Sequence, residues 1–176
     1  MLRFLLSTLV VLINLGLYLQ AQTDEQDLVN ACQGLVTAKY RQWRFVPVMP
    51  AVAEFAKSRN VNPTIIFGDF DGDSRKDVAL LVQDGPVPAT DYPERLDSLH
   101  IAVCMNMRAT RKLYLIDKPY CGDGIQIAPK GGRYYDYETE TDGSYKRDGV
   151  HAYCFEKAGA TYEFDKGSFR KIVDSD

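Results

Sequence analysis

Residues 67–77 read Phe-Gly-Asp-Phe-Asp-Gly-Asp-Ser-Arg-Lys-Asp, and the apolar run Val-Ala-Leu-Leu-Val follows at residues 78–82. The acidic positions are Asp69, Asp71, Asp73 and Asp77. Short loops wrap calcium with oxygen ligands at alternate positions and a backbone carbonyl between them. Without a cation, carboxylates about 4 Å apart would repel by about 1 kcal/mol or more for each pair. We therefore predict a calcium-binding loop, with an exposed acidic turn as the alternative, because Asp and Gly are also ordinary turn residues.

The segments on either side of this loop are predicted to be β-strands. Thr64-Ile-Ile-Phe67 is β-branched and aromatic, and residues 77–83 are largely apolar. An EF-hand would need a helix on each side, glycine at the sixth loop position and glutamate at the twelfth. This chain has Ser74 and Leu80 there, and Pro63 leaves no room for an entering helix. The sequence therefore predicts a strand–loop–strand calcium site that is not an EF-hand.

Residues 68–80 closely resemble the calcium loop of FG-GAP/VCBS-type repeats, which occur in integrin α-subunit propellers. Members of that family carry Gly-Asp-x-Asp/Asn-Gly-Asp-Gly-x-x-Asp before an apolar strand. The resemblance implies that Asp69, Asp71, Asp73 and Asp77 are side-chain ligands and that Arg75 adds its backbone carbonyl. Ser74 stands where the family usually has glycine, so this serine is expected to hold a left-handed conformation.

The resemblance covers only this short stretch of the 176-residue chain. A propeller repeats such a blade several times around a channel, whereas this sequence has one copy. The resemblance therefore implies a local unit of strand, calcium loop and strand, rather than a propeller fold or an adhesive function. The general layout also looks like that of small exported bacterial-type proteins that carry one such loop in an α+β domain.

The rest of the chain is predicted to contain helices first and strands afterwards. Apolar residues recur on one face within residues 24–43, and a second helical pattern covers residues 51–59. Later segments read as strands in hairpins, with a clear turn at residues 165–167. This order predicts an α+β fold with N-terminal helices packed on a mainly antiparallel sheet. We expect one domain over residues 22–176 that contains the calcium loop at residues 68–77.

The N-terminus is predicted to be a signal peptide over residues 1–21. Arg3 precedes an almost wholly apolar run from Phe4 to Leu19, and the small residue Ala21 suits a cleavage site. The alternative is an uncleaved membrane anchor, against which the short run and the polar Asn14 argue. We therefore expect a periplasmic or secreted protein with no membrane attachment after cleavage.

The four cysteines are predicted to form two structural disulfides. An even number of cysteines in an exported chain most simply means a disulfide framework, because oxidising compartments preserve such bonds. None of the spacings resembles a zinc knuckle or a CxxC pair. The pairing stays open among Cys32, Cys104, Cys121 and Cys154.

Composition and charge exclude some partners and chemistries. The formal net charge is −3 and the basic residues are scattered, which gives no case for nucleic acid or for an anionic membrane surface. The two histidines, His100 and His151, lie in alternating strands, where a structural or exposed histidine is expected rather than a catalytic one. The sequence has no nucleophile elbow, phosphate-binding glycine loop or His-Glu-x-x-His motif.

Residues 134–137 form an aromatic stretch that could bind a sugar or a protein, since tyrosine is enriched at interfaces. We favour the simpler interpretation, in which alternate tyrosines pack on the sheet while Asp136 and Glu138 face water.

Taken together, the residues predict a non-enzymatic, exported calcium-binding domain with no catalytic residues and with the ion in a structural role. It would act as a binding module for a protein or carbohydrate partner that the sequence does not identify. Two alternatives remain open. One is a small periplasmic hydrolase in which His100 or His151 meets carboxylates in a pocket. The other is an inhibitor or immunity-like protein that occludes a partner's site.

Overall fold

The computed structural model describes residues 24–85, 94–107 and 110–175. The predicted signal peptide at residues 1–21 lies outside the described residues. Every strand pair in the described part is antiparallel. With the helix at residues 24–39 packed on one sheet, the predicted α+β class is confirmed. Within the described residues, none of the helices has the length and apolar composition needed to cross a bilayer.

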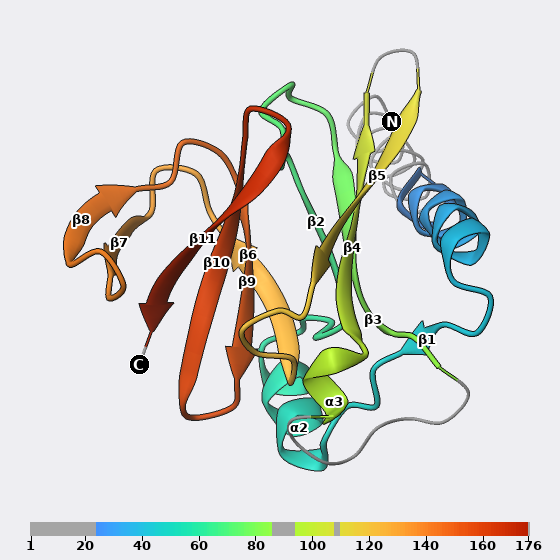
Figure 1. Ribbon diagram of the computed structural model, residues 1–176, viewed down its shortest axis with the longest axis horizontal. Helices are drawn as coiled ribbons and strands as arrows, with labels where there is room; N and C mark the ends of the chain where they lie inside the picture. The colour runs from blue at the N-terminus through green and yellow to red at the C-terminus, as the bar shows by residue number, and fades with distance from the viewer. Residues whose placement is uncertain (1–23, 86–93, 108–109, 176) are drawn as a thin grey trace, which may run out of the picture.

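The first sheet, sheet A, has five strands, and β3 lies at its centre (Figure 1). Its strands are β1 (Arg44–Phe45), β2 (Ile65–Gly68), β3 (Asp77–Gln83), β4 (Leu99–Asn106) and β5 (Arg111–Asp117). Strand β3 is buried along its whole length, as expected for an apolar strand that is covered on both faces. Both β1 and β2 pair with it, β1 at Val82 and Gln83 and β2 over residues 77–80.

The second sheet, sheet B, has four strands in the order β11-β10-β9-β6. They are β6 (Gly124–Ala128), β9 (Gly149–Cys154), β10 (Ala158–Asp165) and β11 (Ser168–Ser175). The turn predicted at residues 165–167 joins β10 to β11, with positive φ at Lys166 and Gly167. A separate hairpin of β7 (Arg133–Asp136) and β8 (Thr141–Ser144) follows β6 along the chain.

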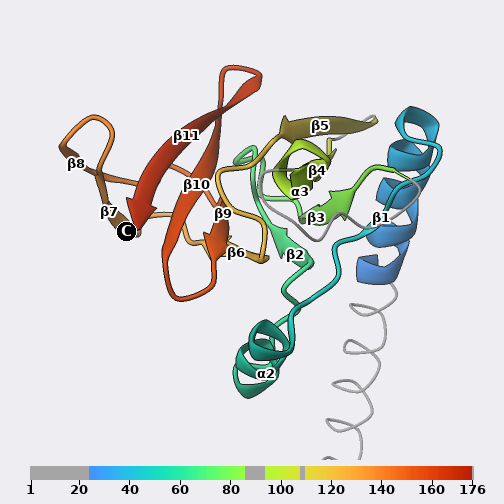
Figure 2. The ribbon, with the colours of Figure 1, turned by 60° about the horizontal axis from the view of Figure 1, so that its bottom comes forward.

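The molecule is layered, with the N-terminal helix on one face of sheet A and sheet B on the other (Figure 2). The helix packs on β3 and β4 through Leu28, Val29 and Val36. Helix α2 (Pro50–Ser58) begins at a proline, which is favourable in the first turn, and its Phe55 ring contacts Tyr153 of sheet B. The short helix α3 (Glu94–Asp97) directly precedes β4.

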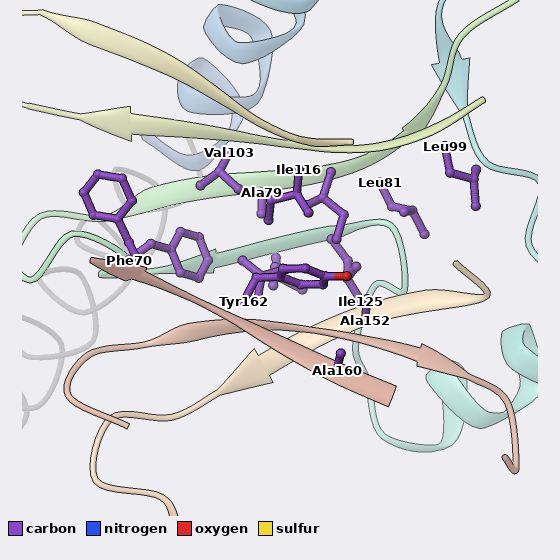
Figure 3. Packing of buried hydrophobic residues seen from close by; sticks show 14 of the residues in the cluster. Phe70, Ala79, Leu81, Leu99, Val103, Ile116, Ile125, Ala152, Ala160 and Tyr162 are labelled. Atoms are coloured by element: carbon purple, nitrogen blue, oxygen red, sulfur yellow. The ribbon is translucent and has the colours of Figure 1, made fainter. Parts of the chain in front are cut away.

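The main core fills the space between the two sheets (Figure 3). Sheet A contributes Ala79, Leu81 and Ile101, and sheet B contributes Ala152 and Tyr162. Alternate residues of a strand point to opposite faces, so Val78, Leu80 and Val82 of β3 face the helix instead. Burial of apolar surface on both sides of sheet A supplies most of the driving force that holds the layers together.

Two disulfides cross-link the fold, as predicted. Cys32 of the N-terminal helix bonds to Cys104 of β4, and Cys121, just before β6, bonds to Cys154 of β9. No cysteine is left free. Because disulfides persist in oxidising compartments, these bonds indicate an environment outside the reducing cytosol.

Candidate metal centre

The acidic loop is the connection of the β2–β3 hairpin. Gly68 of β2 pairs with Asp77 of β3, so the start and the end of the loop lie side by side. Residues 69–76 close the hairpin between them. Pairing of the flanking strands therefore brings the first and last aspartates of the motif together, as the strand–loop–strand prediction required.

Three of the predicted ligands meet at one point. Carboxylate oxygens of Asp69, Asp71 and Asp77 all lie within 4.8 Å of one another. Asp77 is fully buried, and Asp69 and Asp71 are half-buried. Carboxylate oxygens are the ligands that hard divalent cations prefer, so this triad could hold a metal ion.

The backbone of the loop is curled around the first aspartate. Asp69 accepts hydrogen bonds from the N–H groups of Gly72 at 2.9 Å and of Ser74 at 3.0 Å. Asp71 accepts one from the N–H of Asp73 at 3.0 Å. Ser74 has a φ of 67°, so the left-handed conformation expected at this position is confirmed. The curl turns carboxylates inward at alternate positions, and each oxygen keeps a second lone pair for another partner.

Asp77 is the most deeply placed member of the triad. Its two oxygens accept hydrogen bonds from the N–H of Phe70 at 3.0 Å and from the N–H of Asn106 in β4 at 2.7 Å. Burial raises the pKa of Asp77 to about 6, against the hydrogen bonds that lower it, and the charge of Asp71 adds to the rise. The pKa of Asp71 is raised too, first by burial. Burial and the neighbouring carboxylate of Asp71 therefore both disfavour the charged form of Asp77.

Asp73 and Arg75 lie outside this triad. Asp73 accepts a hydrogen bond from the Arg75 N–H at 2.8 Å and faces the Arg75 guanidinium at 3.9 Å. Both residues are exposed. The ligand role of the Asp73 carboxylate and of the Arg75 carbonyl stays a prediction.

Contacts from sheet B support the loop, and sequence reasoning missed them. Asp148, just before β9, accepts hydrogen bonds from the N–H of Asp69 and from the N–H of Lys130, each at 3.0 Å. The Arg147 guanidinium donates to the carbonyl oxygen of Asp71 at 3.1 Å. These residues are more than seventy positions from the loop, and no local pattern marks so distant a contact. The loop is thereby tied to both sheets.

Phe70 anchors the loop in the core. Its side chain is fully buried and lies with residues of both sheets in the main cluster (Figure 3). Its ring covers Gly68, where an added Cβ would come within 2.8 Å of the ring and 3.2 Å of Asp148. Phe70, between Asp69 and Asp71, therefore serves to pack the loop against the core, and the absence of a side chain at Gly68 makes room for its ring.

The other candidate residues are distributed over both sheets. His100 contacts exposed Asp117 at 2.7 Å and stacks on Tyr40. In the 134–137 stretch, Asp136 is buried rather than facing water. Its carboxylate accepts hydrogen bonds from the backbone N–H groups of Glu138 and Val173 and from the hydroxyl of Thr139. The interpretation of this stretch was wrong at Asp136 and also at Tyr135 and Tyr137, which are exposed rather than packed on a sheet.

Comparison of the chain with protein-family models, with curated proteins and with solved structures finds no match. The resemblance to FG-GAP/VCBS-type loops is therefore limited to the short motif at residues 68–80.

Proposed function

We propose that this chain is an exported domain in which calcium, held at the β2–β3 loop, stabilises a surface for binding a partner. The observation that carries the proposal is the convergence of three carboxylates within 4.8 Å in a half-buried loop. Asp69, Asp71 and Asp77 would supply side-chain oxygens, joined by Asp73 and the carbonyl of Arg75. The ion would supply the positive charge that the raised pKa of Asp77 indicates is lacking.

Calcium suits this loop better than magnesium. Magnesium demands near-ideal octahedral geometry and usually keeps several waters, whereas calcium accepts six to eight oxygens in a flexible shell. The loop offers many oxygens on a short, irregular backbone. Extracellular calcium modules commonly bind with Kd of about 10⁻⁴ to 10⁻³ M, so a site of this kind stays filled outside the cell and acts as a structural element.

The position of the loop favours a structural role for the ion. It contacts β4 through Asn106 and sheet B through Arg147 and Asp148, so an ion here would join the two sheets. Exposed tyrosines outside the loop, Tyr135 and Tyr137, offer contact area for a protein or carbohydrate partner. The net charge of −3 argues against nucleic acid as that partner.

Thermal unfolding with calcium or with chelator tests the proposal. At 100-fold excess over Kd, a ligand specific for the folded state adds about 2.7 kcal/mol, so Tm should rise clearly in 10 mM calcium. Asp71→Ala and Asp77→Ala should abolish the rise, while Asp142→Ala, an exposed aspartate in β8, should keep it. Magnesium at the same concentration should give a smaller shift. Equal melting of the wild type in calcium and in chelator would rule the proposal out.

A further inference from the structure

A second group of polar side chains is buried on the face of sheet B that points away from sheet A. His151 comes from β9, Thr161 from β10 and Asp174 from β11, and Tyr145 reaches them from just after β8. The side chains of His151 and Asp174 are only 12% and 6% exposed. The imidazole of His151 is thus part-buried beside a carboxylate.

The contacts of His151 fix the orientation of its ring. Nδ1 lies 3.0 Å from Thr161 Oγ1 and 3.1 Å from Asp174 Oδ1. The other oxygen of Asp174 accepts hydrogen bonds from the hydroxyls of Thr161 and Tyr145. Oδ1 of Asp174 is buried and faces the imidazole. A carboxylate at Nδ1 orients the ring and stabilises its protonated form.

The opposite edge of the ring, Cε1 and Nε2, packs over Gly159, where the absence of a Cβ makes room for it. A Cβ on Gly159 would lie 2.6 Å from His151 Nε2 and 2.6 Å from Ser175 Oγ. These two atoms are therefore no more than twice that distance apart, on the same side of the strand. Rotation about χ1 moves the Ser175 oxygen between staggered positions.

A β-bulge brings Asp174 and Ser175 to this place. Between the pairs Thr161–Ile172 and Gly159–Ser175, β11 has one residue more than β10. The extra residue breaks the alternation of faces. Val173 consequently packs into the core between the sheets, while Asp174 and the following serine both reach the face that carries His151.

Ser175 also lines a hollow of about 310 Å³ between α2 and the turn that joins β9 to β10. Aromatic rings of Phe55, Tyr153 and Phe155 form much of its wall. Small-molecule sites usually have volumes of about 300 to 1,000 Å³ and are mostly apolar with a few polar groups. Ser175 thus lines an apolar hollow and also lies beside the imidazole that Asp174 contacts.

We propose that Ser175, His151 and Asp174 form a hydrolytic site for carboxylic esters whose small apolar acyl group occupies this hollow. The site is separate from the metal loop, and it gives the hydrolase alternative a definite location. Ser175 is the nucleophile and His151 the general base, the pairing that activates a serine hydroxyl. Asp174 is a positioning residue that acts through the imidazole.

The chemistry balances with water as the only co-reactant. The Ser175 oxygen bonds to the carbonyl carbon of the ester, and its proton passes to Nε2 of His151. The carbon–oxygen bond to the alcohol then breaks, and the alcohol leaves with that proton, so that the acyl group is esterified to Ser175. Water attacks this second ester in the same way, giving the carboxylic acid and restoring the serine and the neutral imidazole.

The test uses the full chain in calcium-containing buffer with p-nitrophenyl butyrate as the probe. The wild type should hydrolyse it above the buffer rate, and Ser175→Ala should return the rate to that background. The matched control is Ser168→Ala, an exposed serine of the same strand, which should keep the wild-type rate. A fluorophosphonate should add to Ser175, located by mass spectrometry of the digested protein.

The role of His151 and Asp174 has its own readouts. His151→Gln should lower kcat by about 10² to 10⁴-fold, the usual share of general-base catalysis, with unchanged Tm as the check that the variant folds. Asp174→Asn should move the acid limb of the pH–rate profile to lower pH, because a neutral amide does not stabilise the imidazolium. The proposal is overturned if the wild type does not exceed background, if Ser175→Ala keeps activity, or if the phosphonate adds elsewhere.

Discussion

Two buried carboxylates, Asp77 in the loop and Asp174 in sheet B, have their pKa values moved in opposite directions. Burial raises the pKa of Asp77 to about 6, and the neighbouring charge of Asp71 raises it further. Burial also acts against ionisation of Asp174, but hydrogen bonds from His151, Thr161 and Tyr145 outweigh it and lower the pKa. Sheet B therefore surrounds its acid with hydrogen-bond donors that favour the charged form, whereas burial and a second carboxylate disfavour the charged form of Asp77.

The largest expected effect concerns what holds the loop in place. Phe70→Ala removes a fully buried ring between the sheets and should lower the free energy of unfolding by about 3 to 5 kcal/mol. It should also weaken the response to calcium, because the carboxylates flank this anchor. Urea unfolding with and without calcium measures both effects. Tyr137→Ala, which removes an exposed ring, is the control and should change stability by less than about 1 kcal/mol. An equally small loss for Phe70→Ala would show that the ion alone positions the loop.

The pH dependence of the free energy of unfolding, measured without metal, should distinguish Asp77 from Asp174. A pKa raised from 3.8 to about 6 favours the protonated, folded form, so stability is highest below the ordinary pKa and declines as pH rises to about 6. At 1.36 kcal/mol per pKa unit, Asp77 accounts for a decline of up to about 3 kcal/mol. Asp174 acts in the opposite sense, and its contribution is lost only below its ordinary pKa.

Urea unfolding in chelator between pH 4 and pH 7 measures this decline, and Asp77→Asn should flatten it. The same protons compete with calcium, so the calcium-dependent rise in Tm should shrink from pH 7 to pH 5. An unchanged pH slope in Asp77→Asn would contradict the assignment of the decline to this residue.

A smaller effect is expected at the junction between the loop and sheet B. Asp148→Ala leaves the N–H groups of Asp69 and Lys130 without their acceptor and should cost about 1 to 3 kcal/mol. Amide hydrogen exchange should speed up at these two positions, while the amide of Val173, which bonds to Asp136, should keep its rate. Uniform acceleration over the whole chain would instead indicate global destabilisation.

The smallest effect is expected at Ser74, whose φ of 67° is unfavourable for a residue with a Cβ. Ser74→Gly should stabilise the protein by up to about 1 kcal/mol, since a left-handed serine costs at least about that much. Ser144→Gly, in strand β8, should instead destabilise by about 0.5 to 1 kcal/mol. A loss of stability in both variants would show that Ser74 is not strained.

The sequence predicted those features that depend on neighbouring residues. The hairpin around the loop and the α+β order follow from local patterns of apolar, acidic and turn residues, and the left-handed Ser74 follows from the resemblance to FG-GAP/VCBS-type loops. The sequence did not predict contacts between segments that are far apart in the chain. The approach of Asp148 to the loop, the pairing of Cys32 with Cys104, and the bulge that places Asp174 beside His151 depend on how two sheets pack, which no short pattern encodes. The burial of Asp136 was misjudged for the same reason.

The disulfides have a consequence for how the molecule could be assembled and taken apart. Cys32–Cys104 lies wholly on the side of sheet A, and Cys121–Cys154 lies wholly within sheet B. The first bond ties the N-terminal helix to sheet A and the second ties the segment before β6 to β9, so neither bond joins sheet A to sheet B. The junction between layers relies on apolar packing and on the loop, both of which are reversible. If the loop binds calcium as proposed, the calcium concentration outside the cell would then set how strongly the two sheets are held together, while each side keeps its own disulfide.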